Sequence, residues 1–427
     1  MKKLLILSVL LSGSSLAALP GGLKVVPKNA MSLTGGSEKV VYAGKSENVV
    51  AEDLNVLSKK HLFVYPIAKL DHEHAELEKV ATVHYVKEGD FAIVEPKSNS
   101  ELDLAHFAHH ETGACGALLR LNENSLVEPI RPVAGKPLIS IDTPVDEITK
   151  LQSNIEVSSI KAAILGLENM GTRYHKSETG IQVPGYLAEK YQAMIPKERT
   201  DVSVELLKVR NSPQKNIVIR IKGSEKPEEV VVLGSHIDSI NSSRSKDAPG
   251  ADDDASGTAV NMEIFKVLME NGVRPKRTIE IHGYAAEEIG LVGSAQLASD
   301  YRKNKINVVS MVQFDLALYS DRRGSLDKMF FVSNGTDKEI TGNLMKLAKD
   351  YLKVEVESRR LSAGTSDHQS WMRKGYAAAF PTENPVAYNR RIHSNQDRLD
   401  SLHENAVKFS SLFAKLGVSY VMHYAGF

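Results

Sequence analysis

The chain has only one cysteine, Cys115, among its 427 residues, so no disulfide can form within it even in an oxidising compartment. It has no excess of either charge, with 53 basic and 53 acidic residues, which argues against nucleic acid or an anionic membrane as a partner. Internal repeats and low-complexity tracts are also missing. The remaining composition, 42% hydrophobic and 6% aromatic, is typical of a soluble globular protein, and the length indicates roughly two to three domains.

The first 17 residues have the pattern of a secretory signal peptide. Met1-Lys2-Lys3 is basic, Leu4 to Leu11 is apolar, and Ser15-Leu16-Ala17 forms a small-x-small cleavage site. A membrane anchor is the alternative, but the apolar run is far shorter than the roughly 20 residues of a spanning helix. We therefore expect a cleaved signal peptide at residues 1–17 and an extracellular protein.

Residues 18–137 predict a small α+β unit followed by a linker. Glycine and proline break up residues 18–60, which we expect to be mixed and loop-like. Beyond them the pattern predicts strands at 61–68 and 117–121, a hairpin of strands 80–86 and 91–94, and a helix at 100–111. Residues 122–137 contain three prolines, Pro129, Pro132 and Pro137, and are typical of a linker.

Residues 138–427 predict an α/β domain. Short apolar runs predict strands at 216–221, 229–233, 277–284, 307–314, 329–332 and 377–380. Helical spacing predicts helices within 146–170 and at 186–194, 256–270, 291–303, 338–352, 366–373 and 405–424. This alternation indicates a mixed, mostly parallel central sheet flanked by helices.

Several of these strands lead directly to histidines or acids. They are His236 and Asp238 after strand 229–233, Glu287 and Glu288 after 277–284, Asp315 after 307–314, and His393 after 377–380; three carboxylates, Asp252 to Asp254, precede a helix. Parallel strands end at one edge of a sheet, where open α/β sheets keep their sites. The wide separation excludes a zinc finger or a single-helix H-E-x-x-H site.

These side chains suit a pair of divalent cations. They are too few for two separate four-coordinate sites unless one carboxylate of the Asp252 to Asp254 cluster bridges both ions. Two such cations would polarise a carbonyl and acidify a shared water, and Glu287, next to Glu288, is then placed as the general base. Each residue alone also fits a structural role, as a core histidine or a helix-capping acid. Their coincidence at successive strand ends favours the metal site.

Five segments resemble the ligand segments of the secreted bacterial leucyl aminopeptidases. They are S-H-I-D-S at 235–239, P-G-A-D-D-D-A-S-G at 249–257, A-A-E-E-I-G-L-V-G-S at 285–294, Q-F-D-L at 313–316 and R-I-H-S-N-Q-D at 391–397. That family consists of dizinc exopeptidases of the superfamily that includes glutamate carboxypeptidase. The resemblance runs from about residue 146 to the end and includes Thr172-Arg173-Tyr174 and Ser366 to Trp371. It implies the zinc-exopeptidase fold preceded by a small prodomain.

The resemblance also assigns roles. It implies two Zn²⁺ ions, one on His236 and Asp315 and the other on Glu288 and His393, with Asp253 bridging them, Glu287 as general base and Asp238 orienting His236. It further implies a cis peptide between Asp253 and Asp254. This chain departs from the family pattern at 361–365, where it lacks a tyrosine and a Cys-x-x-x-Cys pair, and at Thr382 and Val386, where bulkier aromatics are common.

The implied activity is hydrolysis of the first peptide bond of peptides with a free N-terminus, with residues 138–427 as the catalytic domain. Residues 18–137 would be a propeptide, acting as inhibitor or folding aid, and we expect a monomer. A carboxypeptidase or dipeptidase of the same superfamily, a glutaminyl cyclase with one zinc, and a non-catalytic binding protein are the alternatives.

One further cluster invites a metal interpretation. His106, His109 and His110 lie close to Cys115, which could also cap a zinc of the main site. Helical spacing of the histidines is more typical of a polar helix face, and a lone cysteine is usually a small buried hydrophobe.

Overall fold

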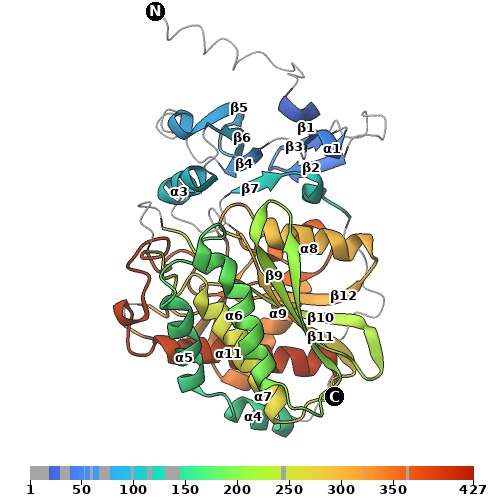
Figure 1. Cartoon of the computed structure of the whole chain (residues 1–427), viewed down its shortest axis with the longest axis vertical. Helices are drawn as coiled ribbons and strands as arrows, with labels where there is room; N and C mark the ends of the chain where they lie inside the picture. Colours follow the sequence, from blue (N-terminus) through green and yellow to red (C-terminus); the bar gives the residue numbers. More distant parts are fainter. Residues whose placement is uncertain are drawn as a thin grey trace, which may run out of the picture.

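The chain folds into a smaller N-terminal part and a larger C-terminal part (Figure 1). This computed structural model describes residues 19–28, 39–51, 53–57, 61–66, 77–97, 101–112, 118–129, 145–241, 247–321, 323–361 and 365–427. The expected signal peptide, Cys115, the side chains of His106, His109 and His110, and residues 130–144 of the region around the expected linker lie outside this description.

Two small antiparallel sheets build the N-terminal part. The first contains β1 (Leu23–Pro27), β2 (Lys39–Ala43) and β3 (Glu47–Ala51) in the order β1-β3-β2, preceded by η1 (Pro20–Gly22) and followed by α1 (Leu54–Leu57). The expectation of a loop-like stretch at 18–60 is therefore wrong. The strands are only five residues long, and each is held by its partners and by buried valines such as Val41 and Val49.

The second small sheet confirms the strands predicted there. It has the order β5-β6-β4-β7, made of β4 (Leu62–Pro66), β5 (Ala81–Lys87), β6 (Phe91–Pro96) and β7 (Leu119–Leu121). β5 and β6 form the predicted antiparallel hairpin. The predicted helix is α3 (Glu101–Thr112), and η3 (Glu123–Ser125) follows β7.

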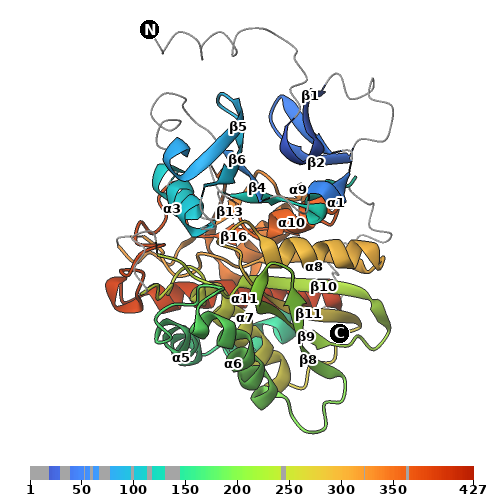
Figure 2. The same cartoon turned by 45° about the horizontal axis from the view of Figure 1, so that its top comes forward.

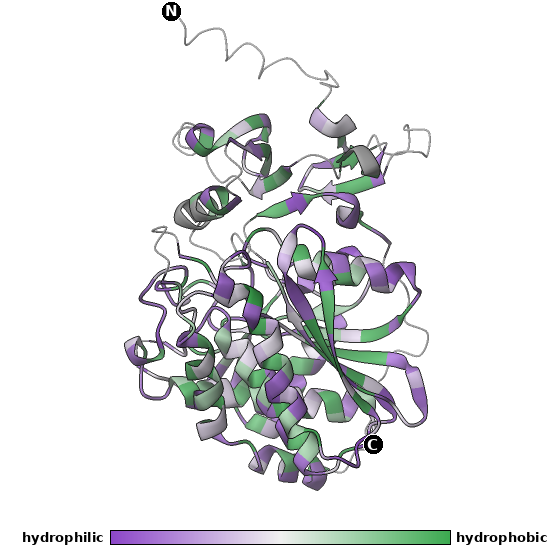
Figure 3. Ribbon diagram, in the orientation of Figure 1, coloured by the Kyte–Doolittle hydropathy of each residue, from purple (hydrophilic) through white to green (hydrophobic). Residues whose placement is uncertain are grey.

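A six-stranded mixed sheet forms the centre of the larger part. Its order is β15-β12-β10-β11-β9-β8, from β8 (Val202–Val209), β9 (Ser212–Ile221), β10 (Lys226–His236), β11 (Arg277–Tyr284), β12 (Asn307–Gln313) and β15 (Ala378–Ala379). The four strands from β15 to β11 are parallel, whereas β9 and β8 are antiparallel. The expected mixed, mostly parallel sheet is thus confirmed. Figure 3 shows the hydrophobic residues concentrated along these strands.

Helices cover both faces of this sheet (Figures 1 and 2). One face packs against α4 (Val145–Ser153), α5 (Val157–Glu168), α6 (Glu178–Met194), α7 (Ala255–Glu270) and α11 (Ala406–Ala425) in the main hydrophobic core. The other packs against α8 (Val292–Lys303) and α10 (His368–Arg373), with Trp371 and Tyr301 at the centre. α7 is buried on nearly all sides because it lies between the sheet, α5 and α11.

A third small sheet extends the larger part. Its order is β14-β13-β16, from β13 (Lys328–Val332), β14 (Glu355–Arg359) and β16 (Pro381–Thr382), with α9 (Lys338–Leu347) and η4 (Ala348–Leu352) connecting the first two strands and η5 (Leu399–Ser401) later in the chain. None of the helices within the described ranges is both long and apolar enough to cross a membrane.

The two parts share a hydrophobic contact close to the loops at the edge of the large sheet. Ile240 of the larger part belongs to the same hydrophobic cluster as Leu104 and Ala105 of α3, and Tyr174 packs against this cluster. Gly290 has φ 109°, and a Cβ there would lie 2.9 Å from the backbone nitrogen of Arg120. The N-terminal part therefore rests directly on loops that follow β10 and β11.

Candidate active site

The parallel strands bring the predicted residues to one edge of the sheet. His236 is the last residue of β10, Asp315 follows β12 by two positions, and Glu287 and Glu288 follow β11 after a two-residue connection. The loop beyond β16 supplies His393. Asp253 precedes α7, and its peptide bond to Asp254 is cis, as the resemblance implies.

Two clusters of nitrogen and oxygen atoms lie at this edge, and they share Asp253. One oxygen of Asp253 lies 2.9 Å from Nε2 of His236, which is also 3.7 Å from Asp315. The other oxygen lies 2.9 Å from Nε2 of His393, which is 2.7 Å from Glu288. Within each triad, the possible ligand atoms lie within 4.8 Å of one another. The structure therefore brings together all five predicted metal-binding side chains.

The chemistry of these atoms fits divalent metal ions. All five side chains are buried, and Oε1 of Glu288 and Oδ1 of Asp315 have no hydrogen-bond donor within the described part of the chain. A buried carboxylate without such partners is costly unless a cation balances it. Imidazole nitrogens and carboxylate oxygens are ligands that zinc accepts. Each triad would provide one histidine, one terminal carboxylate and one oxygen of a shared carboxylate.

Asp238 links the two sides of the site. Its oxygens accept hydrogen bonds from the backbone N–H groups of Glu287 at 2.9 Å and Glu288 at 3.2 Å. One of them also lies 3.6 Å from Nδ1 of His236, the ring nitrogen that faces away from Asp253. Asp238 therefore positions both the histidine and the loop that carries the two glutamates.

Other buried groups hold the remaining ligands and were not assigned from the sequence. Asp397 accepts the backbone N–H groups of Asp252 and Asp253, both at 3.1 Å. Ser366 donates its hydroxyl hydrogen to Oδ2 of Asp315 at 2.5 Å. Both residues occur in the segments that carry the resemblance, which was the only signal for them.

Arg173 joins the loop after β10 to the loop before α7. Its side chain is fully buried and donates to the carbonyl oxygens of Ile237 at 3.1 Å and Gly250 at 2.9 Å, with a third bond to Pro249. Burial lowers the pKa of its guanidinium, and nearby carboxylates, first Asp397, oppose that shift. Arg173 thus fixes the spacing between the backbones that carry His236 and Asp253.

Two of the buried acids, Glu287 and Glu288, favour their protonated forms when no cation balances them, whereas hydrogen bonds from His236 and His393 outweigh burial and lower the pKa of Asp253. Burial raises the pKa of Glu287 well above its usual range, although His236 opposes it. Burial and the charge of Asp253 raise the pKa of Glu288 to about 7, with His393 opposing them. For His236, burial acts to lower the pKa, but Asp315 and Glu287 outweigh it and raise the pKa well above the ordinary value. A cation that binds here would therefore displace protons.

A small pocket adjoins Asp315. Its lining is mostly apolar, from Leu316, Leu361, Phe380, Pro385 and Tyr388, with Thr365, Thr382 and Glu383 completing it. Thr382 also donates to the backbone oxygen of Asp315 at 2.9 Å. Val386, in contrast, is exposed. Thr382, one of the positions at which the chain departs from the family pattern, therefore borders this pocket.

Proteins similar to this chain in sequence include aminopeptidases. The chain is 34% identical over 290 residues to a probable aminopeptidase of Saccharomyces cerevisiae, YDR415C. The aligned region covers 65% of this chain and 76% of the yeast protein. It is 31% identical over 297 residues to leucine aminopeptidase 1 of Aspergillus clavatus, covering 66% and 75% of the two chains.

Comparison of the fold with solved structures also finds an aminopeptidase. The crystal structure of the aminopeptidase LapA of Legionella pneumophila superposes with a TM-score of 0.73 at 26% identity, covering 86% of this chain and 98% of LapA. LapB of the same organism gives a TM-score of 0.70 at 22% identity. Residues 216–414, which span all five residues of the two triads, match peptidase family M28. The chain therefore belongs to peptidase family M28 and is a metal-dependent hydrolase.

Proposed function

We propose that this protein is a secreted aminopeptidase that removes the N-terminal residue of peptides with the help of two zinc ions. The observation that carries the proposal is the pair of buried triads sharing Asp253, with Glu287 next to one of them in the chain. The names of the relatives support the reaction class. The donor set of each triad supports the number of ions.

In this proposal the zinc ions and the side chains of the protein have separate roles. Two zinc ions, when bound, would polarise the scissile carbonyl and make a water molecule acidic enough to attack it. Glu287 takes the proton of that water on a carboxylate oxygen and gives it to the leaving amine nitrogen. Burial raises the pKa of Glu287 in the metal-free site, and bound divalent cations would oppose this rise and favour the carboxylate form that accepts the proton. Asp238 keeps the Glu287 backbone in place.

The same site favours free N-termini and apolar first residues. The buried carboxylates around Asp253 would attract an α-ammonium group, which a blocked peptide lacks. The pocket beside Asp315 offers Leu316, Leu361 and Phe380 to the first side chain. Burial of an aliphatic side chain there supports a leucyl-type preference.

Residues 18–137 act in this proposal as a propeptide of a secreted precursor. Support comes from the separate small sheets of the N-terminal part and from the export pattern at residues 1–17. Limited proteolysis with activity measured before and after cleavage tests it. A rise in activity supports an inhibitory propeptide, and unchanged activity indicates a retained accessory domain.

Zinc content combined with a panel of amino-acid p-nitroanilides tests the central proposal. We expect two zinc ions per chain, cleavage of the leucine substrate and no cleavage of its N-acetylated form. One zinc ion with cyclisation of N-terminal glutamine would indicate a glutaminyl cyclase instead. Cleavage of blocked peptides from the C-terminus would indicate a carboxypeptidase.

A further inference from the structure

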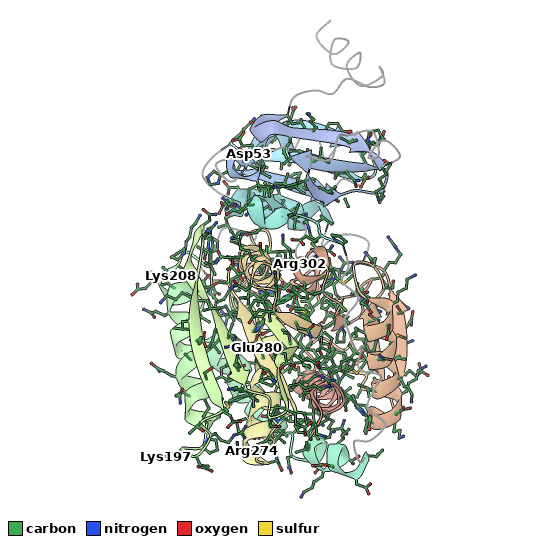
Figure 4. All side chains as sticks on the ribbon, turned by 90° about the vertical axis from the view of Figure 1, so that its right-hand side faces the viewer. Asp53, Lys197, Lys208, Arg274, Glu280 and Arg302 are labelled. Atoms are coloured by element: carbon green, nitrogen blue, oxygen red, sulfur yellow. The ribbon has the colours of Figure 1, made fainter. Side chains whose placement is uncertain are left out.

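The ion pairs between the two parts all have the same polarity. Each ion pair that joins them within the described ranges has its cation on the larger part: Arg210 with Glu123 at 2.5 Å, Arg302 with Glu128 at 2.5 Å, and Lys176 with Glu101 at 3.2 Å. Two of these three pairs involve the short segment 122–128, which follows β7 and is called the strap here. Figure 4 shows Arg302 on the side of the larger part that faces the N-terminal part.

Two more cations of the larger part bind the backbone of the N-terminal part. Arg373, at the end of α10, donates to the carbonyl oxygens of Ser125 at 3.0 Å and of Val41. Lys374 donates to the carbonyl oxygen of Leu126 at 2.9 Å. In return, the backbone N–H of Glu128 donates to the carbonyl oxygen of Arg373 at 2.7 Å. The strap therefore binds through carboxylates and through main-chain groups.

Arg373 and Lys374 are buried by this contact. Their residues are 8% and 2% exposed, which is rare for cationic side chains. Burial lowers the pKa of Arg373 to about 10 and that of Lys374 to about 8. Carbonyl oxygens offset the cost of burying a cation only when they are held at hydrogen-bond distance. The strap is held in this way, because η3 is closed by reciprocal bonds between Asn122 and Ser125.

We propose that Arg210, Arg302, Arg373 and Lys374 form a docking face for an acidic, carbonyl-presenting segment, and that the strap keeps the N-terminal part bound after the chain is cut between residues 129 and 145. The occupant is the strap of this chain. The cleavage step rests on the proposed propeptide function, but binding of the strap to the docking face does not depend on peptidase activity.

The binding of the strap to the docking face should depend on ionic strength only after the chain is cut. While the chain is intact, the tether holds the strap at a high effective concentration, so salt has little effect. After a cut the tether is gone, and binding becomes bimolecular and sensitive to screening of the exposed parts of the ion pairs. An apolar contact would instead be insensitive to salt or strengthened by it.

A cleavable form of the full-length protein tests the proposal. A site for a specific protease is placed within residues 130–144, the folded protein is cut, and the two pieces are followed by size-exclusion chromatography at low and high salt. We expect co-elution at low salt and separation at high salt. The double variant Glu123→Gln, Glu128→Gln should weaken binding by about tenfold, since one exposed and one partly buried ion pair are lost. Glu88→Gln, at an exposed acid of the same part, is the matched control.

The reciprocal variant Arg302→Gln separates docking from misfolding of the N-terminal part. It should weaken binding, and combined with Glu128→Gln it should add little further loss, because both changes remove the same pair. Separation of the wild-type pieces at low salt would overturn the proposal. Co-elution that neither salt nor the double variant changes would also overturn it and would place the binding in the apolar contact around Ile240. Hydrolysis of leucine p-nitroanilide is measured separately, so failure of the docking face and failure of the proposed activity are distinguishable.

Discussion

Asp238 accepts a hydrogen bond from the backbone N–H of Glu287 at 2.9 Å, although the two residues are 49 positions apart in the chain. The same carboxylate lies beside Nδ1 of His236. A single buried acid therefore sets the position of the proposed base and the orientation of a proposed metal ligand. Disturbing it should affect metal binding and proton transfer together.

Asp238→Asn should weaken metal binding by roughly 10- to 100-fold, as is common when a carboxylate behind a ligating histidine is lost. The amide would present one acceptor oxygen instead of two to the N–H groups of Glu287 and Glu288. Competition with a fluorescent chelator measures the affinity, and added zinc should restore part of the activity. An unchanged zinc affinity would contradict the positioning role.

Glu287→Gln should leave the metal content unchanged and reduce kcat by about 10²- to 10⁴-fold or more, because glutamine cannot accept a proton. Steady-state kinetics with leucine p-nitroanilide and metal analysis of the same sample measure the two effects. Glu189→Gln, at an exposed position on α6, controls for general effects of the substitution. A near-normal kcat would remove Glu287 from catalysis.

Arg173→Lys should destabilise the protein by about 2 kcal/mol and weaken metal binding, because one ammonium group cannot reach the carbonyl oxygens of Ile237, Pro249 and Gly250 together. Guanidinium denaturation measures stability, and the d–d spectrum of the cobalt-substituted enzyme reports the ligand geometry. If stability falls while the spectrum and the metal affinity stay those of the wild type, Arg173 serves the fold alone.

Metal uptake should become weaker as the pH falls, first because the metal must displace protons from His393, whose pKa neighbouring carboxylates raise to about 10 against the effect of burial, and more steeply below about 7. In the metal-free site the pKa of Glu288 is raised to about 7, so below that pH a bound proton must leave before a metal ion can bind. Calorimetry in buffers of different ionisation enthalpy measures the protons released on zinc binding. Chelation should abolish activity and lower Tm, since the metal binds the folded state. Zinc binding without proton release at pH 6 would contradict this account.

His175 should make the protein sensitive to acid. Its side chain is buried, and burial lowers the pKa to about 4 from an unfolded value of about 6.5. Between these values the unfolded chain binds one proton more, so the free energy of unfolding falls as the pH drops from 6.5 to 4, by roughly 3 kcal/mol at most. His175→Gln should flatten this part of the stability profile, measured by urea denaturation. An equal slope in both proteins would assign the sensitivity elsewhere.

Local patterns in the sequence were sufficient for most of the large sheet. Apolar runs predicted β9 to β12 and β15 of this sheet, as well as β13 of the small sheet beside it, and the acids and histidines after the strands predicted where the site would lie. β8 and β14 were missed because their strands are half exposed and carry glutamate, lysine and serine, which weaken the apolar signal. The strands at 23–51 were missed because each is short and lies between glycine-rich stretches.

The supporting residues of the site could not be derived from local patterns. Asp397 binds the backbone of Asp253 across a separation of 144 residues, and Ser366 meets Asp315 across 51. Neither contact leaves a periodicity or a spacing in the sequence, because each depends on how distant loops meet in space. Arg173 is a similar case, since a lone arginine in a sequence is usually a surface residue.

The shared carboxylate of Asp253 has a consequence for how a cell would supply this enzyme. Each of its oxygens faces a different imidazole, so in the proposed dizinc function a first ion would hold in place the carboxylate that a second ion needs. Uptake should then be cooperative, and half-filled molecules should be scarce. When zinc is scarce, the population would then consist of fully loaded, active molecules and metal-free, inactive ones, rather than of many partly loaded molecules with low activity.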